Sequence, residues 1–105
     1  MQPRFVYVTC KNKEEALLIG QVVVKERLAA CANVIGGMAA VYWWKGELVT
    51  EQEAVLIFKT QENRMDALIE KVKSEHSYSV PCVVALPILE GNPDYLSWII
   101  KESEN

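Results

Sequence analysis

The chain has 105 residues, of which half are apolar, aromatic or Cys, and its formal net charge is −3 at pH 7. This length predicts one domain over residues 1–105, with no room for a separate catalytic module. Acidic residues outnumber basic ones and no Lys/Arg cluster occurs, which excludes a basic nucleic-acid-binding face. The N-terminal apolar run is far too short for a signal peptide or a membrane span, so we expect a cytoplasmic protein with no membrane partner.

The first residues predict a strand followed by a helix. Phe5 to Val8 are apolar or aromatic, as is typical of a strand. Asn12 followed by Glu15 resembles a capping box, so we expect a helix to open there. The helix is predicted to run from about Lys13 to Leu28, with one apolar stripe that includes Leu17, Gly20, Val24 and Leu28.

Residues 28–60 predict one long hairpin that turns at Lys45-Gly46. Four strand-forming side chains precede the turn, and two loop residues with Gly second suit a type I′ turn. An unbroken ladder from that turn would place Trp44 opposite Glu47. Gly36-Gly37 is expected to interrupt the ladder with a bulge or bend.

The length of this hairpin predicts that its tip extends beyond the body of the domain. Fifteen residues per arm at roughly 3.3 Å each would reach on the order of 50 Å, whereas a domain of this size has a radius of gyration of about 13 Å. In a single chain, the tip would form an apolar patch exposed to water. We therefore expect a second copy of the chain to cover these tip residues, which are Val41, Tyr42, Trp43 and Trp44.

The second half of the chain predicts a helix, a strand and a terminal helix. The helix begins near Met65 and ends around 74–76, and the strand covers Cys82 to Leu86. Asn92 is predicted to cap the last helix, with Pro93 at its first position. The order β-α-β-β-α-β plus a terminal helix predicts an α+β, ferredoxin-like fold with both main helices on one face of the sheet.

Three predicted strands are continuously apolar, which is typical of strands buried on both faces. The chain's own helices can cover only one face. Together with the overhanging tip, this pattern predicts association with further copies; the runs are Phe5 to Val8, Val55 to Phe58 and Val83 to Leu86.

The residue types favour a binding protein over an enzyme. One histidine and no activated-nucleophile motif give little support for catalysis. Three unpaired cysteines and His76 are soft or borderline ligands, suited to copper or zinc. The alternative, favoured by spacing alone, is that Cys10, Cys31 and Cys82 are small buried side chains and that His76 lies at a helix end. Convergence of Cys10 with Cys31 stays open.

The large aromatic residues have two interpretations. Tyr42, Trp43, Trp44 and Trp98 are predicted to be core and subunit-interface residues, with a ligand cleft as the alternative. Lys59 lies late in an apolar strand, where Lys is seldom fully buried. It either extends to the rim or places a cation in an inter-subunit cleft.

Several segments together resemble the divalent-cation-tolerance CutA family over almost the whole chain. They are Leu28-Ala29-Ala30-Cys31-Ala32-Asn33, Val41-Tyr42-Trp43-Trp44-Lys45-Gly46, Phe58-Lys59-Thr60, the segment from His76 to Pro81, Leu86-Pro87-Ile88, and Gly91 with Tyr95-Leu96-Ser97-Trp98. The resemblance implies a ferredoxin-like subunit in a homotrimer similar to PII signalling proteins. It also implies a role in tolerance of copper and other divalent metals, with no established enzymatic activity.

The resemblance also implies site residues. Metal ligands similar to the family's fall on Cys10, Cys31 and His76, and an inter-subunit cleft would involve Trp44, Lys59 and Tyr78. The family usually carries acidic residues where this chain has Ser79 and Cys82. If those acids help to hold a cation, this chain should bind it less well, unless Cys82 makes the site softer and selects Cu(I). The alternative function is a PII-like scaffold that holds a small anion or a partner peptide near Lys59.

Overall fold

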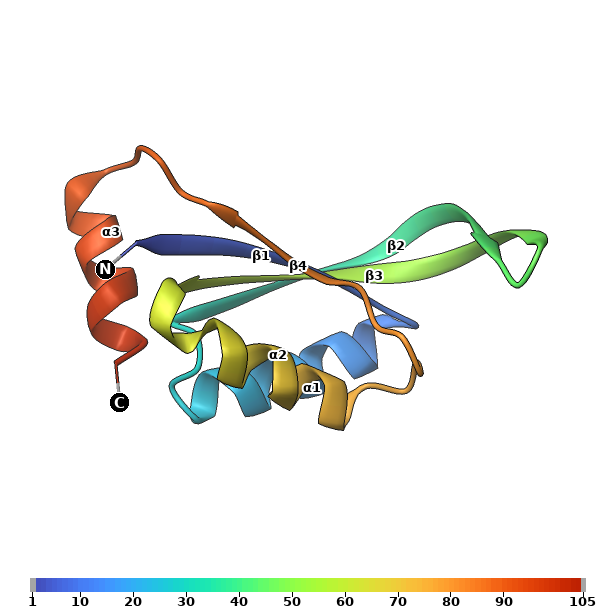
Figure 1. The fold of residues 1–105 in the computed structure, drawn as a ribbon, viewed down its shortest axis with the longest axis horizontal. Helices are drawn as coiled ribbons and strands as arrows, with labels where there is room; N and C mark the ends of the chain where they lie inside the picture. Colours follow the sequence, from blue (N-terminus) through green and yellow to red (C-terminus); the bar gives the residue numbers. More distant parts are fainter. Residues whose placement is uncertain (1, 105) are drawn as a thin grey trace.

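A computed structural model describes residues 2–104 and shows a sheet with helices on one face (Figure 1). Four strands in the order β2-β3-β1-β4 pair antiparallel throughout, which confirms the predicted ferredoxin-like α+β fold. Helices α1 and α2 cover one face, and α3 lies at one end of the sheet. The elements are β1 (Pro3–Cys10), α1 (Lys13–Lys25), β2 (Cys31–Trp44), β3 (Glu47–Gln61), the 3-10 turn η1 (Glu62–Arg64), α2 (Met65–Glu75), β4 (Val83–Pro87) and α3 (Pro93–Glu102).

The core lies between the sheet and its two covering helices. Alternate side chains of β1 and β3 point toward α1 and α2, because successive residues of a strand face opposite sides. Burying these branched and aromatic side chains is the main favourable contribution to folding. The fully buried members include Val6, Val8, Ile19, Val23, Leu56, Phe58, Leu68 and Val72.

Helix α1 ends earlier than the sequence predicted. The expected helix reached Leu28, but α1 ends at Lys25 because Arg27 adopts a left-handed φ of 62°. The Leu28 N–H donates to the Val23 carbonyl at 3.1 Å and the Arg27 N–H donates to Val24 at 3.0 Å, the pattern of a Schellman cap. Gly is the usual residue at the left-handed position, so Arg27 is not recognisable from the sequence as the end of a helix. Of the predicted stripe, Leu17 is exposed and not part of the core.

The central hairpin follows the predicted register. Lys45 and Gly46 have φ values of 50° and 79°, as a type I′ turn requires, and Trp44 pairs with Glu47. The ladder shifts between Ile35 and Met38, where the glycine pair was expected to interrupt it. Gly37 has a φ of 72°, a conformation that a side chain would disfavour.

The tip of the β2–β3 hairpin projects well past the helices, as predicted (Figure 1). The molecule is 44 Å along its longest axis but only 26 and 21 Å along the others. Val41, Trp43 and Leu48 on one side of the tip are 60–71% exposed. The chain therefore leaves a row of large apolar side chains in water at the tip.

The sheet face opposite α1 and α2 is called the open face here. It carries Phe5, Tyr7, Val84 and Leu86, which form two cross-strand pairs between β1 and β4. The expected burial of these strands on both sides does not occur within one chain, since Val84 and Leu86 are 54% and 62% exposed. No element within residues 2–104 covers them, because both covering helices lie on the other face (Figure 1).

Candidate metal centre

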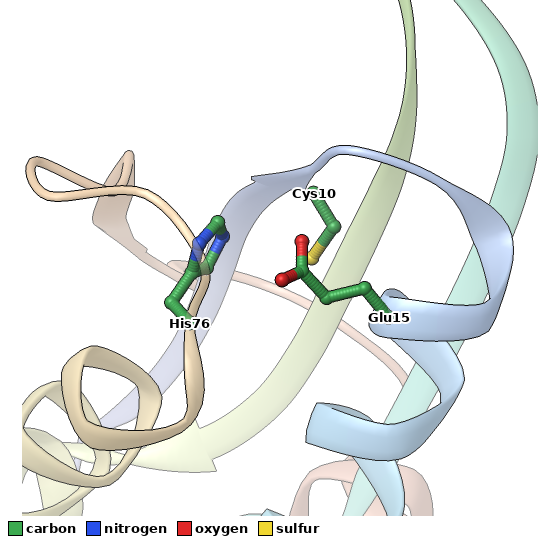
Figure 2. A group of neighbouring side chains, drawn as sticks. All are labelled: Cys10, Glu15 and His76. Atoms are coloured by element: carbon green, nitrogen blue, oxygen red, sulfur yellow. The ribbon is translucent and has the colours of Figure 1, made fainter.

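Cys10, Glu15 and His76 come together at one end of β1 (Figure 2). Cys10 is the last residue of β1, Glu15 lies in the first turn of α1, and His76 directly follows α2. One thiol sulfur, one carboxylate oxygen and one imidazole nitrogen all lie within 4.8 Å of one another. The end of β1, the start of α1 and the residue after α2 thus place three different metal-ligating groups around one point.

The N-terminal cap of α1 orients Glu15. The Asn12 side chain accepts a hydrogen bond from the Glu15 N–H at 2.9 Å, which confirms the predicted cap. The Glu15 carboxylate turns back and accepts from the Lys11 N–H at 3.0 Å. Because the cap fixes both the backbone and the carboxylate, Glu15 is directed toward the end of β1.

The residues after α2 are hydrogen-bonded to this same corner. His76 Nδ1 accepts from the Tyr78 N–H at 3.0 Å, so Nε2 carries the proton and donates to the Thr9 carbonyl at 2.8 Å. The second oxygen of Glu15 accepts from the Ser77 N–H at 2.9 Å. These bonds fix the imidazole ring and hold the segment 76–78 against β1.

Burial and hydrogen bonding shift the pKa values of Cys10 and Glu15. Burial, with smaller effects from Glu15 and Glu53, raises the pKa of the Cys10 thiol to about 12. Burial also opposes ionisation of Glu15, but the hydrogen bonds from Ser77 and Lys11 outweigh it and lower its pKa. The metal-free corner therefore combines a protonated thiol with an ionised carboxylate at neutral pH.

The raised pKa of Cys10 predicts a loss of stability at high pH. The folded thiol keeps its proton above the reference pKa of 9.0, so its contribution is complete below pH 9 and is lost as pH rises toward about 12. We expect the free energy of unfolding to fall by up to about 4 kcal/mol across this window. Urea denaturation of metal-free protein at a fixed protein concentration measures it. Cys10→Ala should remove this part of the slope and Cys31→Ala should not; equal slopes in wild type and Cys10→Ala would contradict the assignment.

The other two cysteines predicted as ligands lie elsewhere. Cys10 pairs with Ala54 on the buried side of the ladder, whereas Cys31 pairs with Lys59, five residues along β3 and on the opposite face. Within one chain the structure therefore does not bring Cys31 to Cys10. Cys82 is half-buried and lines a pocket on the open face, and burial raises the pKa of its thiol.

Sequence reasoning missed Glu15 as a candidate ligand. The capping box already explained Glu15 as a helix-capping residue. Glu15 and His76 are also far apart in the sequence, so nothing indicated that their side chains meet. The signal that was available is the closeness of Cys10 to the predicted cap. A carboxylate in the first turn of a helix that follows a strand-ending cysteine lies near that thiol.

The predicted cleft residues are divided between two places. Trp44 and Tyr78 line the open-face pocket, whose cavity volume is about 740 Å³. Lys59 does not line it: its ammonium contacts the Tyr95 hydroxyl at 3.2 Å and lies 5.4 Å from the centre of that ring. Ser79 and Cys82, which stand where acidic residues were expected, also line this pocket. The absence of those acidic side chains therefore changes the pocket and not the group of Cys10, Glu15 and His76.

The predicted interface residues lie at two ends of the molecule, and all but the half-buried Tyr42 are exposed. Val41, Tyr42 and Trp43 lie on the projecting hairpin, where the Tyr42 hydroxyl donates to Glu51 at 2.9 Å. Trp98 lies on α3 and stacks on Tyr95, with ring centres 5.5 Å apart. Figure 1 places α3 and the hairpin tip at opposite ends. Their role in an interface stays a prediction.

Comparison with known proteins identifies close relatives over nearly the whole chain. Residues 4–102 match the family model described as CutA1 divalent ion tolerance protein. The chain is 49% identical over 94 residues to the chloroplastic protein CutA 1 of Oryza sativa, covering 90% of this chain and 53% of that protein. It is 46% identical to the divalent-cation tolerance protein CutA of Thermus thermophilus, covering 90% of this chain and 91% of that protein.

Solved structures give the same result. The crystal structure of CutA1 from Oryza sativa has a TM-score of 0.94 and 46% identity, and the match covers 100% of this chain and 95% of that one. The chain thus spans about half of the curated rice protein but nearly all of the portion in its crystal structure. The cytoplasmic location stays a prediction; residues 2–104 contain no helix with the length and apolar character needed to cross a bilayer.

Proposed function

The chain belongs to the CutA1 divalent ion tolerance family, and we propose that it acts in metal tolerance by binding copper or another divalent ion at Cys10, Glu15 and His76. The observation that carries this proposal is the convergence of the three ligand atoms within 4.8 Å. A thiolate, an imidazole and a carboxylate form a mixed donor set that suits Cu(II) and Zn(II) far better than Mg²⁺ or Ca²⁺.

The spacing of the donor atoms fits a shared ion after a small contraction. Ligands about 2.0 to 2.3 Å from a tetrahedral ion lie about 3.3 to 3.8 Å from one another. Each donor must also exchange an existing partner, because His76 and Glu15 already bond to backbone groups and the Cys10 thiol holds its proton. If His76 keeps its bond to the Thr9 carbonyl, its ring stays oriented as metal-binding histidines usually are.

Copper is the preferred ion in this proposal. Cu(II) exceeds the other divalent first-row ions in affinity for a given nitrogen, oxygen and sulfur site. Three protein donors leave a coordination position for water or an exchangeable ligand, which suits a protein that takes up and releases the ion. Cys31 and Cys82 do not belong to the convergent group of one subunit.

The functional form in this proposal is a homotrimer in which neighbouring copies cover the open face and the hairpin tip. The exposed pair Val84 and Leu86 and the apolar tip residues Val41 and Trp43 support association. Such patches mark interaction surfaces on soluble proteins. The number three comes from the resemblance to CutA proteins, since an exposed face alone does not set the number of copies.

Calorimetric titration of metal-free protein tests the metal proposal. We expect Cu(II) and Zn(II) to bind with one site per chain and Mg²⁺ to show no binding at the same concentrations. His76→Ala and Glu15→Gln should each weaken Cu(II) binding at least about tenfold. Glu14→Gln, an exposed neighbour in the same helical turn, is the matched control and should leave affinity unchanged. Equal affinity in wild type and His76→Ala would remove the proposal.

A further inference from the structure

The imidazole of His76 has one lone pair to offer, and that lone pair is already in use. Its Nδ1 accepts a hydrogen bond from the Tyr78 N–H at 3.0 Å. Its Nε2 faces the Thr9 carbonyl at 2.8 Å, and because a carbonyl can only accept, Nε2 carries the proton. A neutral imidazole has one protonated nitrogen and one acceptor nitrogen, so the ring has no second acceptor with which to bind an ion.

Binding of an ion by His76 therefore takes away the acceptor of the Tyr78 N–H, whichever ring nitrogen is the ligand. If Nδ1 is the ligand, the ion replaces the Tyr78 N–H directly. If Nε2 is the ligand, the ring proton resides on Nδ1, which then donates and can no longer accept. Both groups belong to the same chain, so this count does not depend on what covers the open face.

The contact between Ser77 and Glu15 is not lost in the same way. The Ser77 N–H donates to one oxygen of the Glu15 carboxylate at 2.9 Å, and the Lys11 N–H donates to the other at 3.0 Å. A carboxylate has about four lone-pair sites, so Glu15 can bind an ion and keep the Ser77 N–H. Ser77 thus has an anchor that remains when the centre is loaded.

The side chain of Tyr78 has an anchor of its own. Its hydroxyl donates to Glu53 on β3 at 2.7 Å, and its ring centre lies 4.8 Å from that of His76. The Ser77–Tyr78 peptide group lies between these two anchors, so it can turn while the residues on either side stay attached. Residues 76–82 lie between α2 and β4 and form no helix or strand that would resist this turn.

We propose that the Ser77–Tyr78 peptide group is a metal-operated switch, whose N–H points to His76 in the empty protein and turns to solvent in the loaded one. An N–H without a partner is costly away from water, which favours the turn. Ser77 is exposed, so the turn changes the backbone groups presented at the surface. A partner that contacts this segment can thereby distinguish loaded from empty protein. The inference rests on the proposed function, since it requires His76 to be a ligand.

Amide hydrogen exchange, measured by NMR on the intact assembled protein, tests the switch. Zn(II) is the ion to use, because its filled d shell leaves the spectrum unbroadened. We expect saturating Zn(II) to accelerate exchange of the Tyr78 N–H at least about tenfold. The Asp94 N–H on α3, which the Asn92 side chain holds at 3.1 Å, is the matched control and should not change. A Tyr78 N–H that is equally protected with and without Zn(II), or unprotected in metal-free protein, would overturn the proposal.

Replacing the Ser77–Tyr78 peptide bond with an ester tests the same competition through affinity. The ester keeps both side chains and removes the Tyr78 N–H, so the ion has no hydrogen bond to displace. Zn(II) should then bind about two- to tenfold more tightly. The same replacement at the Pro93–Asp94 bond removes the control N–H and should leave the affinity unchanged. Equal Zn(II) affinity in the Tyr78 ester and the natural chain would contradict the switch.

Calorimetry with His76→Ala separates this inference from the proposed metal centre. If His76→Ala weakens Zn(II) binding but Zn(II) leaves the exchange of the Tyr78 N–H in the natural chain unchanged, the switch fails and the metal centre stands. If His76→Ala leaves Zn(II) binding unchanged, the proposed centre fails and the switch fails with it.

Discussion

Replacing Leu86 with Glu is expected to dissociate the assembly. Leu86 lies on β4 in the open face, opposite Phe5, and is 62% exposed in a single chain. If neighbouring copies cover this face, the substitution buries an unpaired carboxylate, which should weaken association by at least about a hundredfold. Sedimentation velocity at micromolar concentration measures the change in mass.

Leu18→Glu is the control for Leu86→Glu. Leu18 is equally exposed, at 61%, but lies on α1, on the other side of the sheet. The same change of charge at that position should leave the assembly intact. A Leu86→Glu protein that sediments like the wild type would show that another surface holds the copies together, or that the chain does not associate.

Replacing Cys10 with Ser is expected to reduce Cu(II) affinity at least about a hundredfold and to abolish the absorption band of a copper–thiolate bond. Cys10 supplies the only thiol in the convergent group, and a hydroxyl is a much poorer ligand for copper. Absorption spectroscopy and competition with a chelator of known affinity measure both effects.

Cys31→Ser is the matched control, because Cys31 lies on the opposite face of the sheet in the same chain. It should keep the band and the affinity. If Cys31→Ser loses the band while Cys10→Ser keeps it, the thiolate comes from Cys31 and the centre is built between copies. That result would move the metal site to the open face.

The fold could be predicted well from the sequence because the signals for turns and helix ends are local. The Lys45-Gly46 turn and the shift at the glycine pair fixed the register of the longest hairpin, and Asn12 and Asn92 marked two helix starts. These signals depend on the conformations that individual residues favour, which a single sequence shows. The end of α1 was missed because Arg27 occupies a position where Gly is the usual signal.

The candidate sites were harder to predict because they depend on which face a side chain takes. Even when a strand's position in the sequence is known, the face of the sheet on which Cys10 or Cys31 lies depends on how the strands pair. The register places them on opposite sides of the sheet, and it places Lys59 beside Tyr95 and away from Tyr78. Glu53 shows the same limit: a charged residue in a strand is usually exposed, yet its side chain is almost fully buried.

X-ray absorption spectroscopy of the zinc- or copper-loaded protein tests the central claim most directly, because it counts the sulfur ligands of the bound ion. The account predicts one sulfur at about 2.3 Å, with nitrogen and oxygen ligands at about 2.0 to 2.1 Å. These are the Cys10 thiolate, the His76 imidazole and the Glu15 carboxylate. A spectrum without sulfur, or with two or more sulfurs per ion, would contradict it.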